Sequence, residues 1–132
     1  MWLLTPLGFF SIMCKPDDVG RGTLTIRARV KSDLEALREC LVPDLGEIEE
    51  SAGTDYRYRA NAKRNQVAEA LAKLVQDLDY ENFKNEVAKK QGKHRATIYG
   101  KVWDVLYGLQ TATEQQVSRQ SASGDVGPRE KP

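Results

Sequence analysis

The amino-acid sequence predicts a small α+β domain. In it, an antiparallel sheet of three to four strands in ββαββ order is followed by two or three C-terminal helices. Two segments alternate apolar and polar residues with a period of two, which is typical of strands with one buried face. Later segments place apolar residues at helical spacing. The 132 residues suit one domain, and hydrophobic and charged residues make up 40% and 30% of them, a globular balance.

The predicted sheet begins with the apolar segment 8–14, which a turn at residues 15–22 joins to the alternating segment 23–31. A short helix follows over about residues 33–41, with Ser32 and Glu35 as its capping box. Residues 47–50 and 55–62 then predict a second hairpin. We expect a two-layer sandwich whose sheet carries the helices on one face and its arginines on the other.

Three helices are predicted in the second half of the chain. The first covers residues 67–78, the second follows a bend near Asp79, and the third covers about residues 94–109. Asp79 is the expected N-cap of the second helix and Gly92 its C-cap. In the third helix we expect five residues to face the core: Ile98, Val102, Val105, Leu106 and Leu109.

The composition changes after residue 109. Residues 110–132 are rich in Gln, Ser, Gly and Pro, and apart from alanines their only apolar side chains are Val117 and Val126. Such a segment cannot repay the entropy lost on ordering. The sequence therefore predicts one domain over residues 1–109 and a disordered tail over residues 110–132.

Charge and cysteine content exclude several classes. The net charge of +1 provides no global attraction to nucleic acid or membrane. Cys14 and Cys40 lack metal-ligand spacing, so we expect two buried free thiols, no metal and no cofactor. The apolar run 2–14 is too short to span a bilayer and has no basic residue before it, which favours a buried strand over an export signal. A cytoplasmic protein without membrane contact is expected.

Arginines of the predicted sheet form the first candidate site. Arg27, Arg29, Arg57 and Arg59 point away from their apolar neighbours and would share one face if the strands are adjacent. Guanidinium groups bind phosphate or carboxylate, and Phe9 could add an aromatic ring, as in sheet-based binders of single-stranded RNA. The favoured alternative is that these arginines are solvated or paired, with Glu47 opposite Arg59 and Glu49 opposite Arg57.

A basic helical segment forms the second candidate. Residues 84–101 hold six bases and one acid, whereas the rest of the chain holds 14 bases and 18 acids. Residues 87–99 resemble the helix-turn-helix of bacterial DNA-binding proteins, with Arg95, Thr97 and Tyr99 facing a groove. The match departs from the motif at Gln91, Lys93 and Lys101, where apolar residues are expected. A solvated basic face is the favoured alternative. The residues proposed to contact nucleic acid here are Lys89, Lys90, Lys93 and Arg95.

An aromatic stripe of the last predicted helix forms the third candidate. Tyr99, Trp103 and Tyr107 lie at helical spacing and would mark a dimer or partner surface if the sheet leaves them exposed. This hypothesis requires no residue or motif that is missing from the sequence. The preferred function is therefore that of a non-enzymatic interaction or ligand-binding protein, with a possible homodimer. Nucleic-acid binding is the alternative.

Enzymatic activity ranks third. The chain has one histidine, His94, and no neighbour in sequence that would orient it or act as a nucleophile. A catalytic cleft would have to assemble Tyr58, Arg59, Asp79 and His94 from distant segments. Asp77, Asp79 and Glu81 lie at helix ends, where capping is favoured over a metal site. The sequence therefore assigns no catalytic residue.

Three blocks of the chain together carry a resemblance to a known protein family. They are residues 1–3 with 8–11, residues 54–60, and a last block of Asp79-Tyr80, Asn82-Phe83-Lys84, Gln91-Gly92, Tyr99, Val102-Trp103 and Leu106-Tyr107. With these blocks in this order, residues 1–109 resemble a family of short, uncharacterised bacterial proteins. The resemblance implies a bacterial cytosolic protein and brings no known activity, ligand or functional residue.

Overall fold

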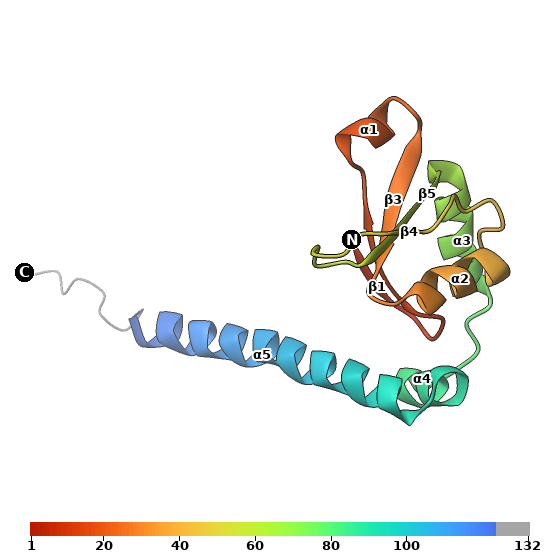
Figure 1. Cartoon of the computed structure of the whole chain (residues 1–132). Coiled ribbons are helices and arrows are strands. Elements are labelled where there is room, and N and C mark those ends of the chain that lie inside the picture. Colours follow the sequence, from red (N-terminus) through yellow and green to blue (C-terminus); the bar gives the residue numbers. More distant parts are fainter. Residues whose placement is uncertain (124–132) are drawn as a thin grey trace, which may run out of the picture.

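The computed structural model describes residues 1–123 as a five-stranded sheet with helices (Figure 1). The elements in chain order are β1 (Trp2–Leu4), β2 (Phe9–Met13), α1 (Pro16–Val19), β3 (Thr23–Ala28), α2 (Lys31–Cys40), β4 (Glu49–Glu50), β5 (Tyr58–Lys63), α3 (Arg64–Gln76), α4 (Phe83–Gln91) and α5 (Lys93–Ser123). The spatial order of the strands is β1-β2-β3-β5-β4, and every neighbouring pair is antiparallel. The predicted α+β class is confirmed.

The strand count differs from the prediction because of β1, and the element order differs also because α1 lies within the predicted turn at residues 15–22. This strand has three residues and is joined to β2 by a tight turn. The Thr5 hydroxyl organises the turn: it accepts hydrogen bonds from the Leu7 and Gly8 amides at 3.1 Å and donates one to the Gly8 carbonyl at 2.9 Å. Period-two alternation cannot be recognised over three residues, so the apolar run 2–14 reads as one strand where the protein forms two.

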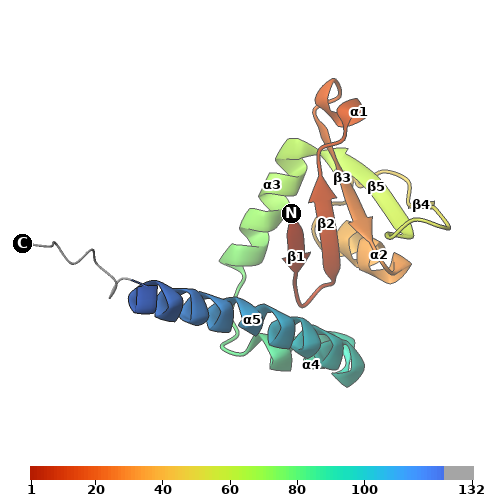
Figure 2. The same ribbon diagram turned by 90° about the vertical axis from the view of Figure 1, so that its left-hand side faces the viewer.

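Helices α2 and α3 cover one face of the sheet and enclose the main core, as the turned view shows (Figure 2). Side chains on alternate strand positions supply one wall of this core, among them Phe10, Ile12, Ile26, Ala28, Ala60 and Ala62. Leu34, Leu37, Val67 and Ala70 supply the helical wall. Burial of this apolar surface is the main force holding the two layers together.

The opposite face of the sheet carries a row of side chains that crosses all five strands. Strand register places Trp2 opposite Ser11, Ser11 opposite Arg27, Arg27 opposite Arg59, and Arg59 opposite Glu49. Directly opposed residues share a sheet face, so this row defines what we call the open face. The predicted separation of helices and arginines onto two faces is therefore seen for α2 and α3.

Two predicted helix caps are wrong. Helix α2 begins at Lys31 after Val30 as N-cap, and no side chain bonds to that cap, so Ser32 and Glu35 form no capping box. Helix α4 is capped by Asn82, whose side chain accepts from the Asn85 amide at 2.9 Å, instead of by Asp79. Gly92 is the C-cap of α4 as predicted, and its φ of 93° is the left-handed conformation that glycine tolerates best.

Helix α5 is longer and more exposed than predicted. It continues to Ser123, so the boundary expected at residue 109 does not end the helix, and residues 110–123 are helical where a disordered tail was expected. Residues 124–132 lie outside the described part of the chain. Four of the five predicted core residues, Ile98, Val105, Leu106 and Leu109, are exposed. The side chains of α5 that are buried are Ala96 and Tyr99, which form a second small core with Val87 of α4.

The cysteines are also placed differently. Cys14 follows the end of β2 and Cys40 is the last residue of α2, and both are free and exposed, so the prediction of buried thiols is wrong. Within residues 1–123, no helix is long and apolar enough to cross a membrane.

Candidate functional site

One buried carboxylate fixes α5 against the end of the sheet. Asp33, in the first turn of α2, is 3% exposed. It accepts a hydrogen bond from the Phe9 amide at 3.0 Å and two from the Arg95 guanidinium at 2.8 and 3.0 Å. The hydrogen bonds with Asp33 raise the pKa of Arg95, so this guanidinium remains charged. The bidentate geometry fixes the orientation of both side chains.

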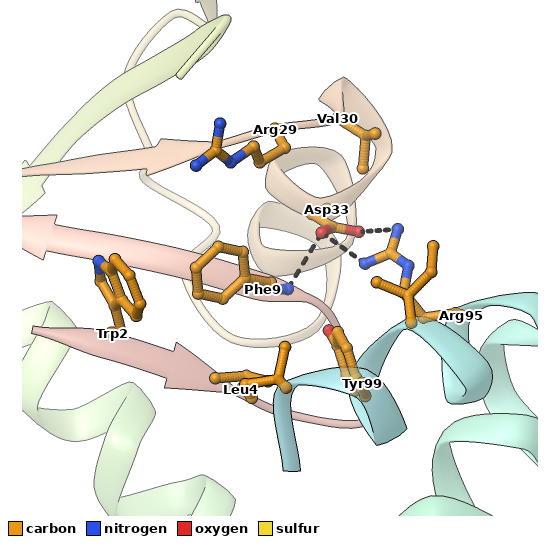
Figure 3. Close-up of a pocket in the computed structure, with 10 residues that line it drawn as sticks. Trp2, Leu4, Phe9, Arg29, Val30, Asp33, Arg95 and Tyr99 are labelled. Atoms are coloured by element: carbon orange, nitrogen blue, oxygen red, sulfur yellow. Dashed lines mark hydrogen bonds and ion pairs between the residues drawn. The ribbon is translucent and has the colours of Figure 1, made fainter. Parts of the chain in front are cut away.

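A cavity of about 400 Å³ opens beside this pair, between the end of the sheet and the first turns of α5 (Figure 3). Most of its lining is apolar: Trp2, Leu4, Phe9, Val30, Ile98, Tyr99 and Val102. Its volume lies within the range of about 300–1,000 Å³ that is typical of small-molecule sites. The register explains the sheet wall, because Leu4 lies opposite Phe9 and both therefore project on the open face.

Aromatic rings form a connected row along this wall. The Trp2 ring meets Phe9 edge-on with a centroid separation of 6.0 Å, and Phe9 lies 6.3 Å from Tyr56. At the helical side, Tyr99 stacks on Phe83 of α4 at 5.8 Å. Burial raises the pKa of the Tyr99 hydroxyl, so this residue is neutral at ordinary pH. Of these rings, Trp2, Phe9 and Tyr99 line the cavity.

The charged groups of the lining are Arg29, Asp33 and Arg95. Asp33 and Arg95 neutralise each other, whereas Arg29 is exposed and forms no ion pair with any described residue. Its guanidinium donates to the Asp55 carbonyl and lies 4.5 Å from the centre of the Tyr56 ring, which holds it at the rim. The site thus combines an apolar interior with one uncompensated positive charge.

The other sheet arginines each form a polar contact within the chain, although the buried Nε atoms of Arg27 and Arg59 have no hydrogen-bond partner among the described residues. Arg27 and Arg59 are directly opposed on adjacent strands, which is the adjacency that the sequence left open. Arg27 donates to the Ser11 hydroxyl at 2.9 Å, and Arg59 donates to Thr54 at 3.2 Å. Arg57 pairs with Glu50 at 2.6 Å. The predicted ion-pair partners are therefore wrong by register: Glu49, not Glu47, lies opposite Arg59, and Glu50 takes the place expected for Glu49.

The turn between α4 and α5 has the order of a helix-turn-helix, but two of its presumed groove-facing side chains point into the protein. Arg95 binds Asp33, and Tyr99 is 7% exposed. Thr97 is exposed, and its hydroxyl donates to the Lys93 carbonyl of its own helix. Lys89 and Lys93 are exposed and form no ion pair among the described residues, whereas Lys90 pairs with Glu86 at 3.4 Å.

Only two of the three residues of the predicted partner surface are exposed. Trp103 and Tyr107 are exposed and stack on each other at 5.5 Å, whereas Tyr99 is buried. The residues of the hypothetical catalytic cleft, Tyr58, Arg59, Asp79 and His94, are all absent from the lining of the cavity. Among the described residues, no group of three or more His, Cys, Asp or Glu side chains could hold a metal ion.

Sequence reasoning missed most of the cavity. Trp2 and Leu4 were assigned to an apolar run, Val30 to the apolar positions of the predicted strand 23–31, and Asp33 only to the start of a helix. The missing signal is the pairing of Asp33 with Arg95, which lie 62 positions apart. A buried acid at the start of α2 and a base at the start of α5 give no local pattern that connects them.

Comparisons with known proteins found no matching family model, no matching curated protein and no matching solved structure. The resemblance to a family of short bacterial proteins therefore stays an expectation.

Proposed function

We propose that this protein is a non-enzymatic binding protein for a small organic anion with an apolar body. The observation that carries the proposal is the apolar cavity with the unpaired guanidinium of Arg29 at its rim. The apolar body would lie between Trp2 and Phe9 on the sheet and Ile98 and Val102 on α5. The anionic group, a carboxylate or a sulfonate, would lie against Arg29.

Physical chemistry supports this ligand class. Burying apolar ligand surface contributes about 25 cal/mol per Å², so the cavity lining favours the body of the ligand. A charge-assisted hydrogen bond from a guanidinium to an anion contributes about 1.5–3 kcal/mol. A cationic ligand would be repelled by Arg29 and would find Asp33 already occupied by Arg95.

A pair of fluorescent probes with the same ring system tests this proposal. Anilinonaphthalene sulfonate carries an anionic group, and phenylnaphthylamine is its uncharged counterpart. We expect both to bind, the sulfonate more tightly. Near-ultraviolet circular dichroism on the same samples verifies that the packing of the protein is native, because loosely packed proteins also bind such dyes.

Two variants assign the binding to the cavity. Arg29→Gln is expected to weaken binding of the sulfonate about tenfold, equivalent to about 1.4 kcal/mol, and to leave the uncharged probe unchanged. The control Arg21→Gln removes an exposed arginine in the turn before β3 and should affect neither probe. Ile98→Trp should fill the cavity and weaken both. Binding of both probes that is indifferent to Ile98→Trp would refute the proposal.

Nucleic-acid binding is a second candidate, favoured by one observation. Lys84, Lys89, Lys93 and Lys101 of α4 and α5 are exposed and form no ion pairs with described residues. Such a segment could contact phosphate groups, and the affinity would then fall steeply with salt because counterions are released.

The test of this candidate is binding of random duplex and single-stranded DNA at low and moderate salt. Lys89→Gln combined with Lys93→Gln should weaken binding and reduce the salt dependence, whereas Lys73→Gln in α3, whose ammonium pairs with Asp77, is the control. Absence of binding at low salt would remove this candidate and leave the ligand site unaffected.

A further inference from the structure

Two arginines lie directly opposite each other on the open face of the sheet. Strand register pairs Arg27 of β3 with Arg59 of β5. Both side chains are half-buried, and neither forms an ion pair within residues 1–123. Like charges directly opposite each other destabilise a sheet, and burying a charge without a counterion costs free energy. An anion bound to both guanidinium groups would remove both costs.

Much of the hydrogen-bonding capacity of these two guanidinium groups is unused. Each group has five N–H donors. Nη2 of Arg27 donates to the Ser11 hydroxyl at 2.9 Å. Nη2 of Arg59 donates to the Thr54 hydroxyl at 3.2 Å and to the Tyr56 carbonyl at 3.4 Å. Nε and Nη1 of both arginines have no acceptor in the part of the chain that the structure describes, so donors remain for a ligand.

The hydroxyl group of Ser11 adds a further donor beside Arg27. Ser11 is 2% exposed and lies opposite Arg27 on β2. Its oxygen accepts the hydrogen bond from Arg27, whereas its own hydrogen has no acceptor among residues 1–123. Buried polar groups of proteins are nearly always hydrogen-bonded. The Ser11 hydroxyl can therefore donate to an oxygen of an anion that Arg27 binds.

The acidic residues of the open face do not neutralise the two arginines. Glu49 lies opposite Arg59 on the edge strand β4, but it is exposed and forms no ion pair with any residue that the structure describes. Asp18 lies beside the next residue pair of the sheet, Thr25 and Asn61, and accepts hydrogen bonds from both. The described chain thus supplies no carboxylate as a counterion for Arg27 and Arg59.

We propose that Arg27, Arg59 and Ser11 bind a phosphate group that carries two negative charges. Two charges match the two guanidinium groups, and the oxygens of a phosphate accept the paired N–H donors of arginine. A free phosphate ion and a small phosphate monoester share this chemistry. Neither Arg27 nor Arg59 lines the cavity, so this inference does not rest on the proposed site for an apolar anion.

Titration of the full chain with inorganic phosphate tests the proposal, with the ionic strength held constant by sodium chloride. In nitrogen-15 NMR spectra, the Nε–H signals of Arg27 and Arg59 should shift and reach saturation. The Nε–H signal of Arg21, which is exposed in the turn before β3, should not shift. Methyl phosphate distinguishes the two sources of the group: tighter binding than inorganic phosphate would favour a monoester, and weaker binding would favour the free ion.

Four variants assign the binding to this pair. Arg27→Gln and Arg59→Gln should each weaken phosphate binding about tenfold, equivalent to one lost charge-assisted hydrogen bond. Arg57→Gln is the matched control, because Arg57 already pairs with Glu50, and it should leave the affinity nearly unchanged. Glu49→Gln keeps both arginines and removes a negative charge opposite Arg59, so it should strengthen binding. Circular dichroism verifies that each variant is folded.

Two results would overturn the phosphate site. The first is a set of shifts that sodium chloride alone reproduces. The second is an equal phosphate affinity of the Arg27→Gln and Arg57→Gln variants. The site can also fail separately from the cavity: Arg29→Gln, which should weaken binding of anilinonaphthalene sulfonate, should reduce phosphate binding much less than Arg27→Gln does.

Discussion

Arg95 of α5 and Asp33 of α2 face each other as a bidentate ion pair, and the same carboxylate accepts the amide hydrogen of Phe9 in β2. One buried side chain therefore links two helices and a strand that are far apart in the sequence. The pair also forms part of the wall of the cavity. Its geometry decides where α5 leaves the sheet, and hence the shape of the proposed ligand site.

Replacing Arg95 should lower the free energy of unfolding more than neutralising Asp33 does. Arg95→Met leaves the Asp33 carboxylate buried with one remaining donor, and we expect a loss of about 3 kcal/mol in the free energy of unfolding, at the low end for buried pairs because Arg95 is partly exposed. Asp33→Asn keeps an acceptor for Phe9 and should cost less. Urea unfolding measures both changes. The control Arg57→Met breaks the exposed pair with Glu50 and should have a small effect.

A glycine next to this carboxylate gives an independent measure of how rigidly it is held. A Cβ atom added at Gly8 would lie 2.7 Å from Cγ of Asp33. Because Arg95 and Phe9 fix Asp33, the carboxylate cannot move away freely, and Gly8→Ala should destabilise the protein by about 1–3 kcal/mol. Gly20→Ala is the matched control, since its Cβ would meet nothing within 4 Å. Equal thermal unfolding temperatures for the two variants would contradict the rigid packing.

Local patterns predicted the parts of the fold that depend on neighbouring residues. The alternation from Thr23 to Ala28 identified β3, and the spacing of apolar residues identified α3 and α4. Two kinds of feature were out of reach. The three residues of β1 are too few to show a period, and the docking of α5 depends on the distant partners Asp33 and Arg95.

The exposed side chains of α5 also show what a local sequence pattern cannot predict. An apolar stripe predicts that a helix face is covered, but it does not identify what covers it. Val105 and Leu109 were assigned to the core of their own chain, whereas the structure leaves them exposed. For the site, the arginines were placed on the correct face, but their partners depend on a strand register that the sequence does not define. The cavity follows from tertiary packing alone.

Acid should destabilise the protein through Asp18. This carboxylate is buried between α1 and the open face. Burial opposes its ionisation, but hydrogen bonds from Thr23, the Lys15 amide, Thr25 and Asn61 outweigh that effect and lower its pKa to about 2. In the unfolded chain the pKa of Asp is about 3.9. The stabilisation, of the order of 2 kcal/mol, is present above about pH 4 and is lost as the pH falls toward 2.

Chemical unfolding at a series of pH values tests this assignment. Asp18→Asn should lower the free energy of unfolding at neutral pH. It should also make this free energy depend less on pH between about pH 4 and 2. Asp17→Asn changes the neighbouring exposed carboxylate and should keep the dependence of the original protein. If the Asp18→Asn variant retains the full acid dependence, another carboxylate is responsible.

The Tyr56 hydroxyl should contribute nothing to stability, although its ring should contribute much. Tyr56 is 2% exposed, and its hydroxyl is buried without a hydrogen-bond partner in the described chain. An unsatisfied buried hydroxyl costs free energy, so Tyr56→Phe should leave the stability unchanged or raise it. The Cζ atoms of Arg27 and Arg29 lie 4.4 and 4.5 Å from the centroid of the Tyr56 ring. Tyr56→Ala removes both contacts and should cost about 3 kcal/mol or more.

The same pair of variants connects stability to the ligand site. Since Tyr56 holds the guanidinium of Arg29 at the rim, Tyr56→Phe should keep the affinity for anilinonaphthalene sulfonate, because a phenyl ring preserves the contact. Tyr56→Leu, which retains an apolar side chain but no ring face, should weaken binding of the sulfonate more than binding of uncharged phenylnaphthylamine. Titrations of both probes under conditions where circular dichroism shows a folded protein measure this difference. An equal loss for the two probes would mean that Tyr56 supports the cavity as a whole and does not position Arg29.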